Sequence, residues 1–426
     1  MNKKMTKNRR LVPALLAVLL ALLVPAAGAS VLDLNYGATS NWLSAEINGM
    51  GATGVALDRG GFGTALNPAT LTWAGDWRVD GGMSLAEEHE DRFQPLFDSF
   101  GSYVIDTAIA SNRSHRFGSG FAVSRAFGER FGAGLSLSTR YGFGYEFSEE
   151  LRDPDSFSEP RDQILESRGV TRKGDLRDLG LGAAFEISEQ VSLGAALHYV
   201  FGTVEWEERN RLFHDEPNSY VLVDEWKADG LAVTTGLTIT PNERMVFGAS
   251  WDLPFDVGGD ELVTTTEGSP ALPTGVKTHT TVRYPQRARV GFALHPRTEP
   301  LTVFSVEVEW TEWSQLEDSR EEIPHLMENT MDYRVGVQHT FYNGVPLRFG
   351  FRHFDYAADP EASASLFSMG IGAPYADGMI NVGVELGKVI SVQPHFFDYP
   401  EDFAVAASSR VEETMFRLGA TFTYRF

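Results

Sequence analysis

The sequence has no cysteine, no long apolar run after its first thirty residues and no excess of positive charge, and each absence narrows the protein class. Without cysteine the chain forms no disulfide, so its 426 residues must be stabilised by the surface that they bury. No later stretch approaches the roughly 18 consecutive apolar residues of a helical membrane span. The formal charge of −22 argues against nucleic acid as a partner, because phosphate binding requires a basic surface.

The first 29 residues have the features of a secretory signal peptide. The opening MNKKMTKNRR carries five basic residues and no acidic one, and the short apolar run LVPALLAVLLALLVPA follows. Ala27-Gly28-Ala29 then supplies the small residues of a cleavage site. We therefore predict export from the cytoplasm and cleavage before Ser30. No cysteine follows this site, so we expect no lipid anchor.

Glycine and aromatic residues are plentiful, which leaves a large soluble β protein or an outer-membrane barrel. Alternation at the C-terminus favours the barrel. One face of the last predicted strand carries Phe416, Leu418, Ala420, Phe422, Tyr424 and Phe426. The other face carries Arg417, Gly419, Thr421, Thr423 and Arg425. An apolar face opposite a polar or small one suits a strand between lipid and a wet lumen.

The same alternation predicts a series of strands along the chain. In 130–147 one face carries Phe131, Ala133, Leu135, Leu137, Tyr141, Phe143, Tyr145 and Phe147. The opposite face carries Gly132, Gly134, Ser136, Ser138, Arg140, Gly142, Gly144 and Glu146. The predicted strands are 76–87, 113–127, 130–147, 175–188, 191–207, 226–241, 244–257, 283–296, 301–313, 331–341, 344–354, 363–373, 378–387 and 412–426. Their number is even, as single-chain bacterial barrels require.

The connections between these strands alternate in length. Every second one is short, such as GE, SEQ, NE and NG, whereas most others are long and acidic. Short turns at one end and long loops at the other are typical of outer-membrane barrels. We therefore predict an all-β fold, a 14-stranded antiparallel transmembrane β-barrel, in the bacterial outer membrane.

Residues 30–75 precede the first predicted strand and do not alternate. They contain Trp42, Ile47, Leu57, Phe62, Leu66 and Leu71 between glycines. A fourteen-stranded barrel is wider than one that its own side chains fill, so it would leak unless something occupies it. We predict that 30–75 folds as a plug, or hatch, inside the lumen of a barrel formed by 76–426. Asn67 suits a helix N-cap and Pro68 the first helical position, so a short helical turn follows.

The stretch GMGATGVALDRGGFGTALNPATLTW resembles the N-terminal plug of the FadL-type family, outer-membrane transporters of long-chain fatty acids and other hydrophobic compounds. LGLGAAFEISEQVSLGAALHYVFG, RYPQRARVGFALHPR, FSVEVEWTEWS and VPLRFGFRHFDYAADP are also similar to it. The resemblance covers essentially the whole chain after the signal peptide. The chain also ends on Phe426, which resembles the signal that directs bacterial barrels to their assembly machinery.

The resemblance implies a mechanism. In that family the Asn-Pro-Ala run belongs to the plug and lies against an inward kink in the wall, through which substrate leaves sideways into the membrane. Here the matching residues are Asn67, Pro68 and Ala69, with a gating role. Gly142 and Gly144 are candidates for the wall kink, because strand glycines often mark bends. The alternative is that small residues there only make room in the lumen.

Two further groups of residues are candidates for substrate contact. Phe93, Leu96, Phe97 and Phe100 have helical spacing in the first long connection and predict an amphipathic helix, which either captures apolar substrate outside or packs on the barrel rim. Inward-facing arginines either bind a fatty-acid carboxylate or, for most of them, pair with lumen acids such as Glu146, Glu307 and Glu309. These arginines are Arg140, Arg287, Arg289, Arg334, Arg348, Arg352 and Arg417.

Other chemistry finds little support. Gly49 to Gly54 fits a G-x-G-x-x-G pattern, but it follows no convincing strand and lies in an exported protein. Ten histidines lack metal-ligand spacing and no G-x-S-x-G motif is present, so we expect no catalytic residue, metal or cofactor. We predict a monomer in contact with outer-membrane lipid and lipopolysaccharide that takes up a hydrophobic small molecule. The alternatives are aromatic-hydrocarbon uptake, a docking barrel for surface or secreted components, and a non-specific porin.

Overall fold

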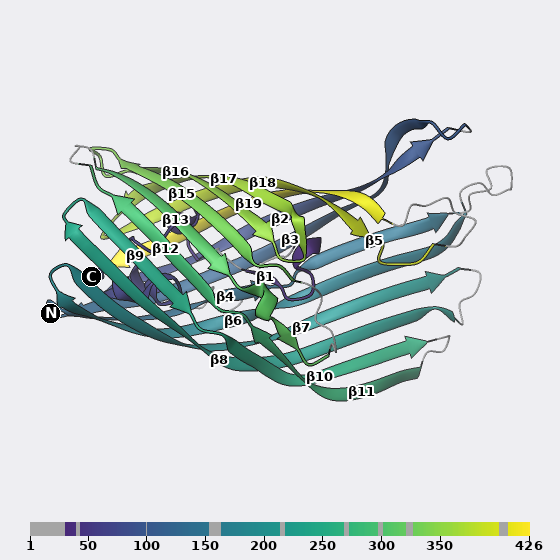
Figure 1. The fold of residues 1–426 in the computed structure, drawn as a ribbon, viewed down its shortest axis with the longest axis horizontal. Helices are drawn as coiled ribbons and strands as arrows, with labels where there is room; N and C mark the ends of the chain where they lie inside the picture. The colour runs from purple at the N-terminus through teal and green to yellow at the C-terminus, as the bar shows by residue number, and fades with distance from the viewer. Residues whose placement is uncertain are drawn as a thin grey trace, which may run out of the picture.

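A computed structural model describes residues 30–39, 43–98, 100–152, 163–213, 218–267, 272–296, 301–320, 327–399 and 408–426. Within these ranges the chain forms a closed antiparallel barrel of 14 strands, with short helical turns of its N-terminal part inside the cylinder (Figure 1). The predicted all-β fold class is therefore confirmed. The predicted signal peptide and Trp42 lie outside the described ranges.

The wall follows chain order from β2 to β19, and β19 closes on β2 through a ladder that pairs Arg425 with Arg78. The pieces β4–β5, β9–β10, β11–β12 and β13–β14 each form one wall strand with an interruption. The bounds are β2 Arg78–Phe97, β3 Tyr103–Phe127, β4 Phe131–Gly142, β5 Tyr145–Arg152, β6 Ile164–Ser188, β7 Val191–Leu212, β8 Tyr220–Asn242, β9 Met245–Asp252, β10 Phe255–Glu267, β11 Leu272–Tyr284, β12 Arg287–Leu294, β13 Thr302–Thr311, β14 Glu317–Asp318, β15 Thr330–Thr340, β16 Pro346–Tyr356, β17 Asp359–Tyr375, β18 Gly378–Pro394 and β19 Ser408–Arg425. A short turn, η5 (Trp313–Gln315), separates β13 from β14.

Apolar side chains cover the outside of this wall. In β19, Phe416 and Leu418 are exposed whereas Gly419 and Thr421 are buried, as the alternation predicts. Exposed apolar side chains on other strands include Phe131, Leu135, Leu181, Leu197, Leu231, Val290, Val306, Phe349, Phe367, Ile371 and Leu386. An apolar outside around a polar interior is the arrangement of a barrel that sits in lipid. No helix in the described ranges has the length and apolarity to cross a bilayer.

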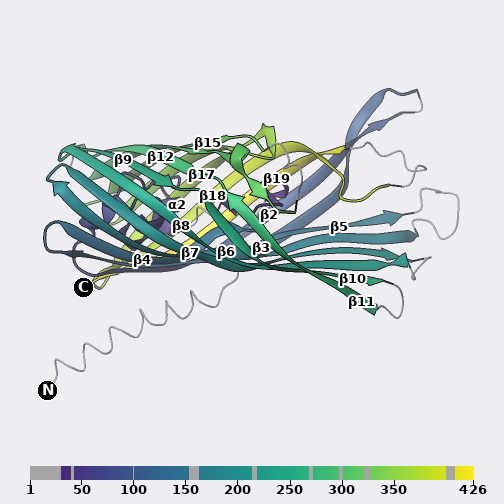
Figure 2. The same ribbon diagram turned by 60° about the horizontal axis from the view of Figure 1, so that its bottom comes forward.

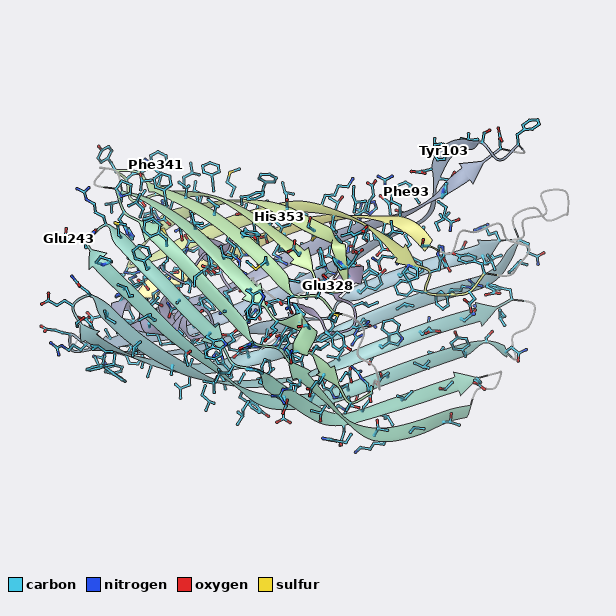
Figure 3. All side chains as sticks on the ribbon, in the orientation of Figure 1. Phe93, Tyr103, Glu243, Glu328, Phe341 and His353 are labelled. Carbon is cyan, nitrogen blue, oxygen red and sulfur yellow. The ribbon has the colours of Figure 1, made fainter. Side chains whose placement is uncertain are left out.

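The two ends of the barrel differ. The turns 128–130, 189–190, 243–244 and 376–377 lie at the end that holds the C-terminus, on the left of Figure 1, near the labelled Glu243 of Figure 3. The β2–β3 hairpin and the far ends of β5 to β8 lie at the opposite end. The predicted separation of short and long connections is confirmed. We call these the short-turn end and the long-loop end, of which the long-loop end faces outward in outer-membrane barrels.

The first long connection is not a helix, so that prediction was wrong. β2 continues to Phe97 and pairs with β3, with bulges at Phe93 and Phe97, and the hairpin projects beyond the rest of the wall (Figures 1 and 2). Beyond Phe93, β2 no longer pairs with β19 and is an edge strand. Pro95 is therefore tolerated, because its missing N–H costs no ladder bond on a free edge. The helical spacing of the apolar residues was coincidental.

The third wall strand also departs from its prediction. The ladder shifts between Thr139 and Tyr141, which leaves Arg140 as an extra residue in β4. One extra residue reverses the side to which all later side chains point. Phe131 and Leu135 accordingly face out, whereas the aromatic residues from Tyr141 onward are buried inside. Glu146, which we expected in the lumen, is exposed outside for the same reason.

The residues before β2, here called the inner segment, lie inside the barrel. Their elements are η1 Val31–Asp33, β1 Ala38–Thr39, α2 Ala45–Asn48, η2 Gly60–Phe62, α3 Gly63–Leu66 and η3 Pro68–Trp73. Ile47, Phe62 and Leu71 are fully buried. Glycines on the inner wall allow the backbone of this segment to approach, since a Cβ on Gly350 would lie 1.9 Å from the nitrogen of Gly51. The segment thus packs against the inner wall backbone to backbone.

Candidate functional site

The Asn-Pro-Ala run joins the inner segment to the wall. Asn67 caps η3 as predicted, because its Oδ1 accepts from the nitrogen of Ala69 at 3.1 Å and Pro68 occupies the first position of the turn. Its Nδ2 donates to the carbonyl oxygen of Val55 at 2.7 Å and to that of Leu237, in β8, at 3.1 Å. One fully buried side chain therefore fixes a turn, a neighbouring loop and the barrel wall together.

Glycines in β7 and β8 make this position possible. A Cβ on Gly236 would lie 2.0 Å from Oδ1 of Asn67, and one on Gly194 would lie 2.4 Å from the nitrogen of Ala69. Real Cβ atoms do not approach other atoms so closely. Any side chain at these two wall positions would push the Asn-Pro-Ala run away from β7 and β8.

Ion pairs hold the inner segment from other sides. Glu46, in α2, lies 3.2 Å from guanidinium nitrogens of both Arg59 and Arg78 and 3.9 Å from that of Arg348. Burial alone would raise the pKa of the Glu46 carboxyl, but the arginines, Arg78 first, lower it to about 2. Glu307 of β13 accepts from the backbone nitrogens at 54 and 55 at 2.8 and 2.9 Å. The segment is thus tied to several wall strands by charge-assisted contacts.

The seven arginines that were predicted to face inward are paired with acids, as we expected for most of them. Glu307 and Glu309 are partners as predicted, whereas Glu146 is not. The pairs are Arg140 with Asp178 and Asp252, Arg287 and Arg289 with Asp252 and Glu309, Arg334 with Glu307, Glu309 and Asp332, Arg348 with Glu46, Arg352 with Asp332, and Arg417 with Glu385. Their charges are neutralised inside the protein, so none of them offers an unpaired cation to a ligand.

Arg172 in β6 differs from these arginines. It is only 8% exposed, and within the described part of the chain no carboxylate lies within ion-pair distance of it. Its Nη2 donates to the carbonyl oxygen of Asn35 at 3.0 Å, and its Nε has no partner. The guanidinium lies over the rings of Phe143 and Trp206, 5.0 and 5.7 Å from their centres. It is a buried cation in aromatic surroundings that forms no ion pair within the described residues, and the carboxyl of Asp224 lines the same cavity.

Arg172 borders a cavity of about 280 Å³ on the inner wall. Val204, Trp206, Leu222, Trp226 and Val263 supply apolar surface, and Asn35, Arg172, Asp224 and Arg320 supply polar groups. A second cavity of about 510 Å³ lies beside residues 30–39 of the inner segment. The lumen therefore offers a cavity with both apolar and polar lining and a cation at its edge, and a larger cavity beside residues 30–39.

Sequence reasoning missed Arg172 because it predicted β6 to begin at 175, whereas the strand begins at Ile164. Val170 and Arg172 continue the alternation of buried residues in β6, and this alternation could have shown that the strand begins before 175. The polar and charged residues before 175 indicate a connection by their composition, but they pair with β5 and β7 and extend the strand.

Interruptions of the wall bring aromatic side chains inside. β9 and β10 are separated by Leu253 and Pro254, and β11 and β12 by Pro285 and Gln286. As at Arg140, the inward face switches at each interruption. Tyr284 is one of the residues turned inward. The centre of its ring lies 4.2 Å from that of Tyr141 and 5.5 Å from that of Phe255. These rings belong to a buried cluster with Tyr36, Phe143, Leu176, Val200, Val204, Trp226, Val257, Val282, Trp313 and Leu316, here called the lumen cluster.

The wall ladder also opens next to this cluster. β3 pairs with β4 only as far as Phe121 with Leu137, and in the described ranges β5 pairs with β6 alone among wall strands. Side chains bridge the interval between β3 and β5. Arg116 donates to the carbonyl oxygen of Gly144 at 2.5 Å, and Asn112 accepts from the nitrogen of Ser148 at 2.9 Å. The opening in the ladder therefore lies where β4 ends and β5 begins.

The candidate kink glycines lie at this opening. Gly142 ends β4 and pairs with Ala38 of β1, so the inner segment adds a short strand to the wall there. Gly144 lies between β4 and β5. Gly37 has a φ of +81°, which favours glycine, and turns the inner segment beside Phe143. The part of the inner segment at the opening is thus 37–39, whereas the Asn-Pro-Ala run lies on β7 and β8.

The predicted capture residues lie on the projecting hairpin. Phe93 is at its base in Figure 3, half-buried beneath the guanidinium of Arg410, and Phe100 at its tip is 90% exposed. The side chains of Leu96 and Phe97 lie outside the described part of the structure. Tyr103, labelled in Figure 3, and Ile105 add exposed apolar surface on β3.

Metal chemistry has no visible basis in the described ranges, where no cluster of three or more His, Asp or Glu side chains is placed to hold an ion.

Solved structures share this fold. A FadL homologue of Pseudomonas aeruginosa matches with a TM-score of 0.65 at 13% identity, over 92% of this chain and 100% of that one. The toluene transporter TodX of P. putida matches with 0.63 at 15%, over 92% and 99%. The CymD monoaromatic hydrocarbon channel matches with 0.62 at 14%, over 90% and 97%. No protein-family model and no curated protein matches the chain. The chain therefore has the barrel fold of the FadL homologue and of these hydrocarbon channels.

Proposed function

We propose that the protein is an outer-membrane transporter that takes up hydrophobic molecules by passive diffusion, and that its substrate is a long-chain fatty acid. The observation that carries the proposal is Arg172, a buried guanidinium that forms no ion pair within the described residues and lies at the edge of a cavity lined by both apolar and polar side chains. A protein seldom leaves such a cation unpaired, because an isolated buried charge is costly. A ligand that brings its own carboxylate and an apolar tail complements both features.

The chemistry of binding follows from these groups. A carboxylate accepts charge-assisted hydrogen bonds from a guanidinium, here at the free Nε of Arg172. The acyl chain lies against Trp206, Trp226 and Val204, and each methylene that it buries contributes about 0.8 kcal/mol. Phe143 and Trp206 support the guanidinium from its faces. The site selects an amphipathic molecule by its head and tolerates many tail lengths.

The exit is lateral in this proposal. Val204 and Trp226 belong both to the lumen cluster and to the lining of the cavity at Arg172, so the cavity borders the cluster. Phe143 of the same cluster lies at the interruption between β4 and β5, where the ladder to β3 is open. A hydrophobic molecule that moves between the β3 and β5 side chains reaches lipid there, beside residues 37–39 of the inner segment.

The inner segment acts as the plug. It packs against the inner wall, and contacts at Asn67, Pro68 and Ala69 set how readily it rearranges. Phe93 and Phe100 of the hairpin serve as the outer landing surface. The protein works as a monomer in lipid and lipopolysaccharide, is inserted through its C-terminal strand, and transports rather than catalyses.

A second substrate class has its own observation. The stacked rings of Tyr141, Tyr284 and Phe255 form an aromatic surface inside the barrel. The structures of similar fold include a toluene transporter and a monoaromatic hydrocarbon channel. A neutral aromatic hydrocarbon would bind this surface without using Arg172.

Binding of matched ligands to the purified protein distinguishes these functions. A long-chain fatty acid, the alcohol of the same chain length and toluene are titrated into wild type and Arg172→Leu. The variant should bind the acid at least about tenfold more weakly, which corresponds to one lost charge-assisted hydrogen bond, and should bind the alcohol nearly as well as wild type. Arg177→Gln, on the same strand and paired with Asp175, is the control and should not change acid binding.

Equal affinity of wild type for acid and alcohol would remove the fatty-acid assignment, and preferential binding of toluene would support the hydrocarbon channel. If none of the three ligands binds, the docking-barrel alternative takes the place of transport.

A further inference from the structure

The first residue expected after signal-peptide cleavage lies against a buried acid. Oγ of Ser30 donates to Oε2 of Glu413 at 2.5 Å, and the backbone nitrogen of Val31 donates to Oε1 at 3.0 Å. Oγ of Ser30 also accepts from the nitrogen of Leu32, which caps η1. Leu32 packs in a cluster with Tyr356. The start of the inner segment is therefore hydrogen-bonded to one carboxyl group of β19.

That carboxylate lacks a cation. Glu413 is 2% exposed, and within the described ranges no lysine, arginine or histidine forms an ion pair with it. It faces Glu90 directly across the β19–β2 ladder, and like charges in that position repel each other. Glu90 forms an ion pair with Arg92, whose Nε lies 2.6 Å from its Oε1, and Glu88 on the same strand pairs with Arg116. Glu413 is thus the member of this acidic group that is left without a counter-ion.

We propose that signal-peptide cleavage supplies the missing cation, and that the α-ammonium of Ser30 forms an ion pair with Glu413 inside the barrel. The inference rests on the predicted cleavage site and not on the proposed transport function. Hydrolysis of the bond between Ala29 and Ser30 consumes one water and leaves a carboxylate on Ala29 and an amine on Ser30. The amine takes up a proton, because α-amino groups titrate at about 7.7–8.0. The new charge therefore arises on the residue that already holds Glu413.

Signal-peptide cleavage completes the contacts that hold the start of the inner segment on β19. In the uncleaved chain the nitrogen of Ser30 is a neutral amide, and only neutral donors contact the buried carboxyl of Glu413. After cleavage the same site holds a pair of opposite charges in a low-dielectric interior, where their attraction is strong. Ser30 also borders the cavity of about 510 Å³, so the ion pair fixes the N-terminus at the edge of the lumen space.

The test measures the reactivity of the α-amine in the full-length protein purified from outer membranes. Mass spectrometry of the N-terminal peptide first defines the mature start. The protein is then treated at neutral pH with an amine-acylating reagent, and labelling of that peptide is followed with time. An ion pair raises the pKa of the amine and lowers its free-base fraction tenfold for each unit of the shift. Labelling should therefore be about tenfold slower in wild type than in Glu413→Gln.

Two further variants keep the test decisive. Glu412→Gln alters the neighbouring residue, which pairs with Lys388 and Arg410, and should label at the wild-type rate. Insertion of Ser-Thr between Ala29 and Ser30 moves the amine away while Glu413 is retained, and should label as fast as Glu413→Gln. Heat-dependent gel migration verifies that each barrel is folded. Equal labelling rates in wild type, the insertion variant and Glu413→Gln, or a mature protein that does not start at Ser30, would overturn the proposal.

Discussion

The side-chain amide of Asn67 donates to the carbonyl oxygen of Leu237 in β8 at 3.1 Å, so a residue of the inner segment is bonded to the backbone of the barrel wall. The same amide donates to Val55, and its oxygen caps η3. Because these bonds converge on one buried side chain, the position of the inner segment is most sensitive to substitution at this residue.

Replacement of Asn67 by alanine should loosen the inner segment without unfolding the barrel. The variant loses an N-cap, worth about 0.5–2 kcal/mol, and leaves the buried carbonyl of Val55 without this donor, at about 1–3 kcal/mol. Hydrogen exchange of residues 43–74 should accelerate while exchange in the wall strands stays unchanged. In the proposed gating role, acyl uptake by cells should also fall. Asn242→Ala, at the exposed end of β8, is the control. Wild-type exchange and uptake in Asn67→Ala would contradict the role assigned to this residue.

A single methyl group at Gly236 should displace the Asn-Pro-Ala run. Its Cβ would lie 2.0 Å from Oδ1 of Asn67, a distance that requires the inner segment to move. Gly236→Ala should therefore reproduce the faster exchange of Asn67→Ala. Gly275→Ala is the matched control, because its Cβ would meet its nearest neighbour at an ordinary 3.5 Å. If both glycine variants exchange alike, the close approach between segment and wall is not what fixes the turn.

Acid should release the inner segment through Glu46. The pKa of this carboxyl is lowered to about 2 against an ordinary 4.5, so its contribution is complete above pH 4.5 and is lost as the pH falls toward 2. The difference corresponds to about 3 kcal/mol. Conductance in planar bilayers should rise over this pH range in wild type, and Glu46→Gln should show the raised conductance already at pH 6.

Glu129→Gln, in a solvent-exposed turn, should keep the wild-type profile in the same experiment. A Glu46→Gln channel that stays closed at pH 6 would show that these ion pairs do not hold the inner segment.

Locking β3 to β5 should block lateral release. Asn112 and Ser148 contact each other across the open part of the ladder, and the chain has no cysteine of its own. The double variant Asn112→Cys, Ser148→Cys should therefore form one defined disulfide under oxidising conditions. We expect fatty-acid uptake to fall at least tenfold in the oxidised form and to recover on reduction, with binding unchanged. Each single variant controls for the substitutions. Full uptake through the oxidised barrel would place the exit elsewhere.

The tip of the projecting hairpin should affect the rate of substrate capture and not the affinity of the lumen site. Phe100 is almost wholly exposed and Phe93 lies at the base of the same hairpin. Phe100→Ser should slow uptake at low ligand concentration a few-fold while the equilibrium affinity of the purified protein is unchanged. Ser102→Ala, next to the same tip, should have no effect. A wild-type rate in Phe100→Ser would assign the hairpin another role.

Much of the fold could be read from the sequence because a barrel wall is specified locally. The alternation of Phe416 and Leu418 with Gly419 and Thr421 depends on one strand between lipid and lumen, and it is confirmed in β19. The cap at Asn67 was predictable for a similar reason, since Asn followed by Pro encodes an N-cap and a first helical position within two residues.

Other features could not be read in this way. The bulge at Arg140 reverses the faces of β4, yet its cause is a shift in pairing with β6 that no local pattern shows. The apolar spacing from Phe93 to Phe100 fits a helix, but β3 pairs with this stretch and makes it a strand. Arg172 precedes the predicted start of its strand at 175, and only the assembled barrel shows that it is buried without an ion pair among the described residues.

The sequence by itself determined a barrel with an apolar outside, its strand order, its short and long connections, and the local turn at Asn67, because each depends on residues close together in the chain. Tertiary structure alone decided where the wall opens, which aromatic rings turn inward, which arginine lacks a partner and which acid meets Ser30. Those outcomes depend on register and on contacts between residues as far apart as Ser30 and Glu413, and such distances are closed only when the sheet curls into a cylinder.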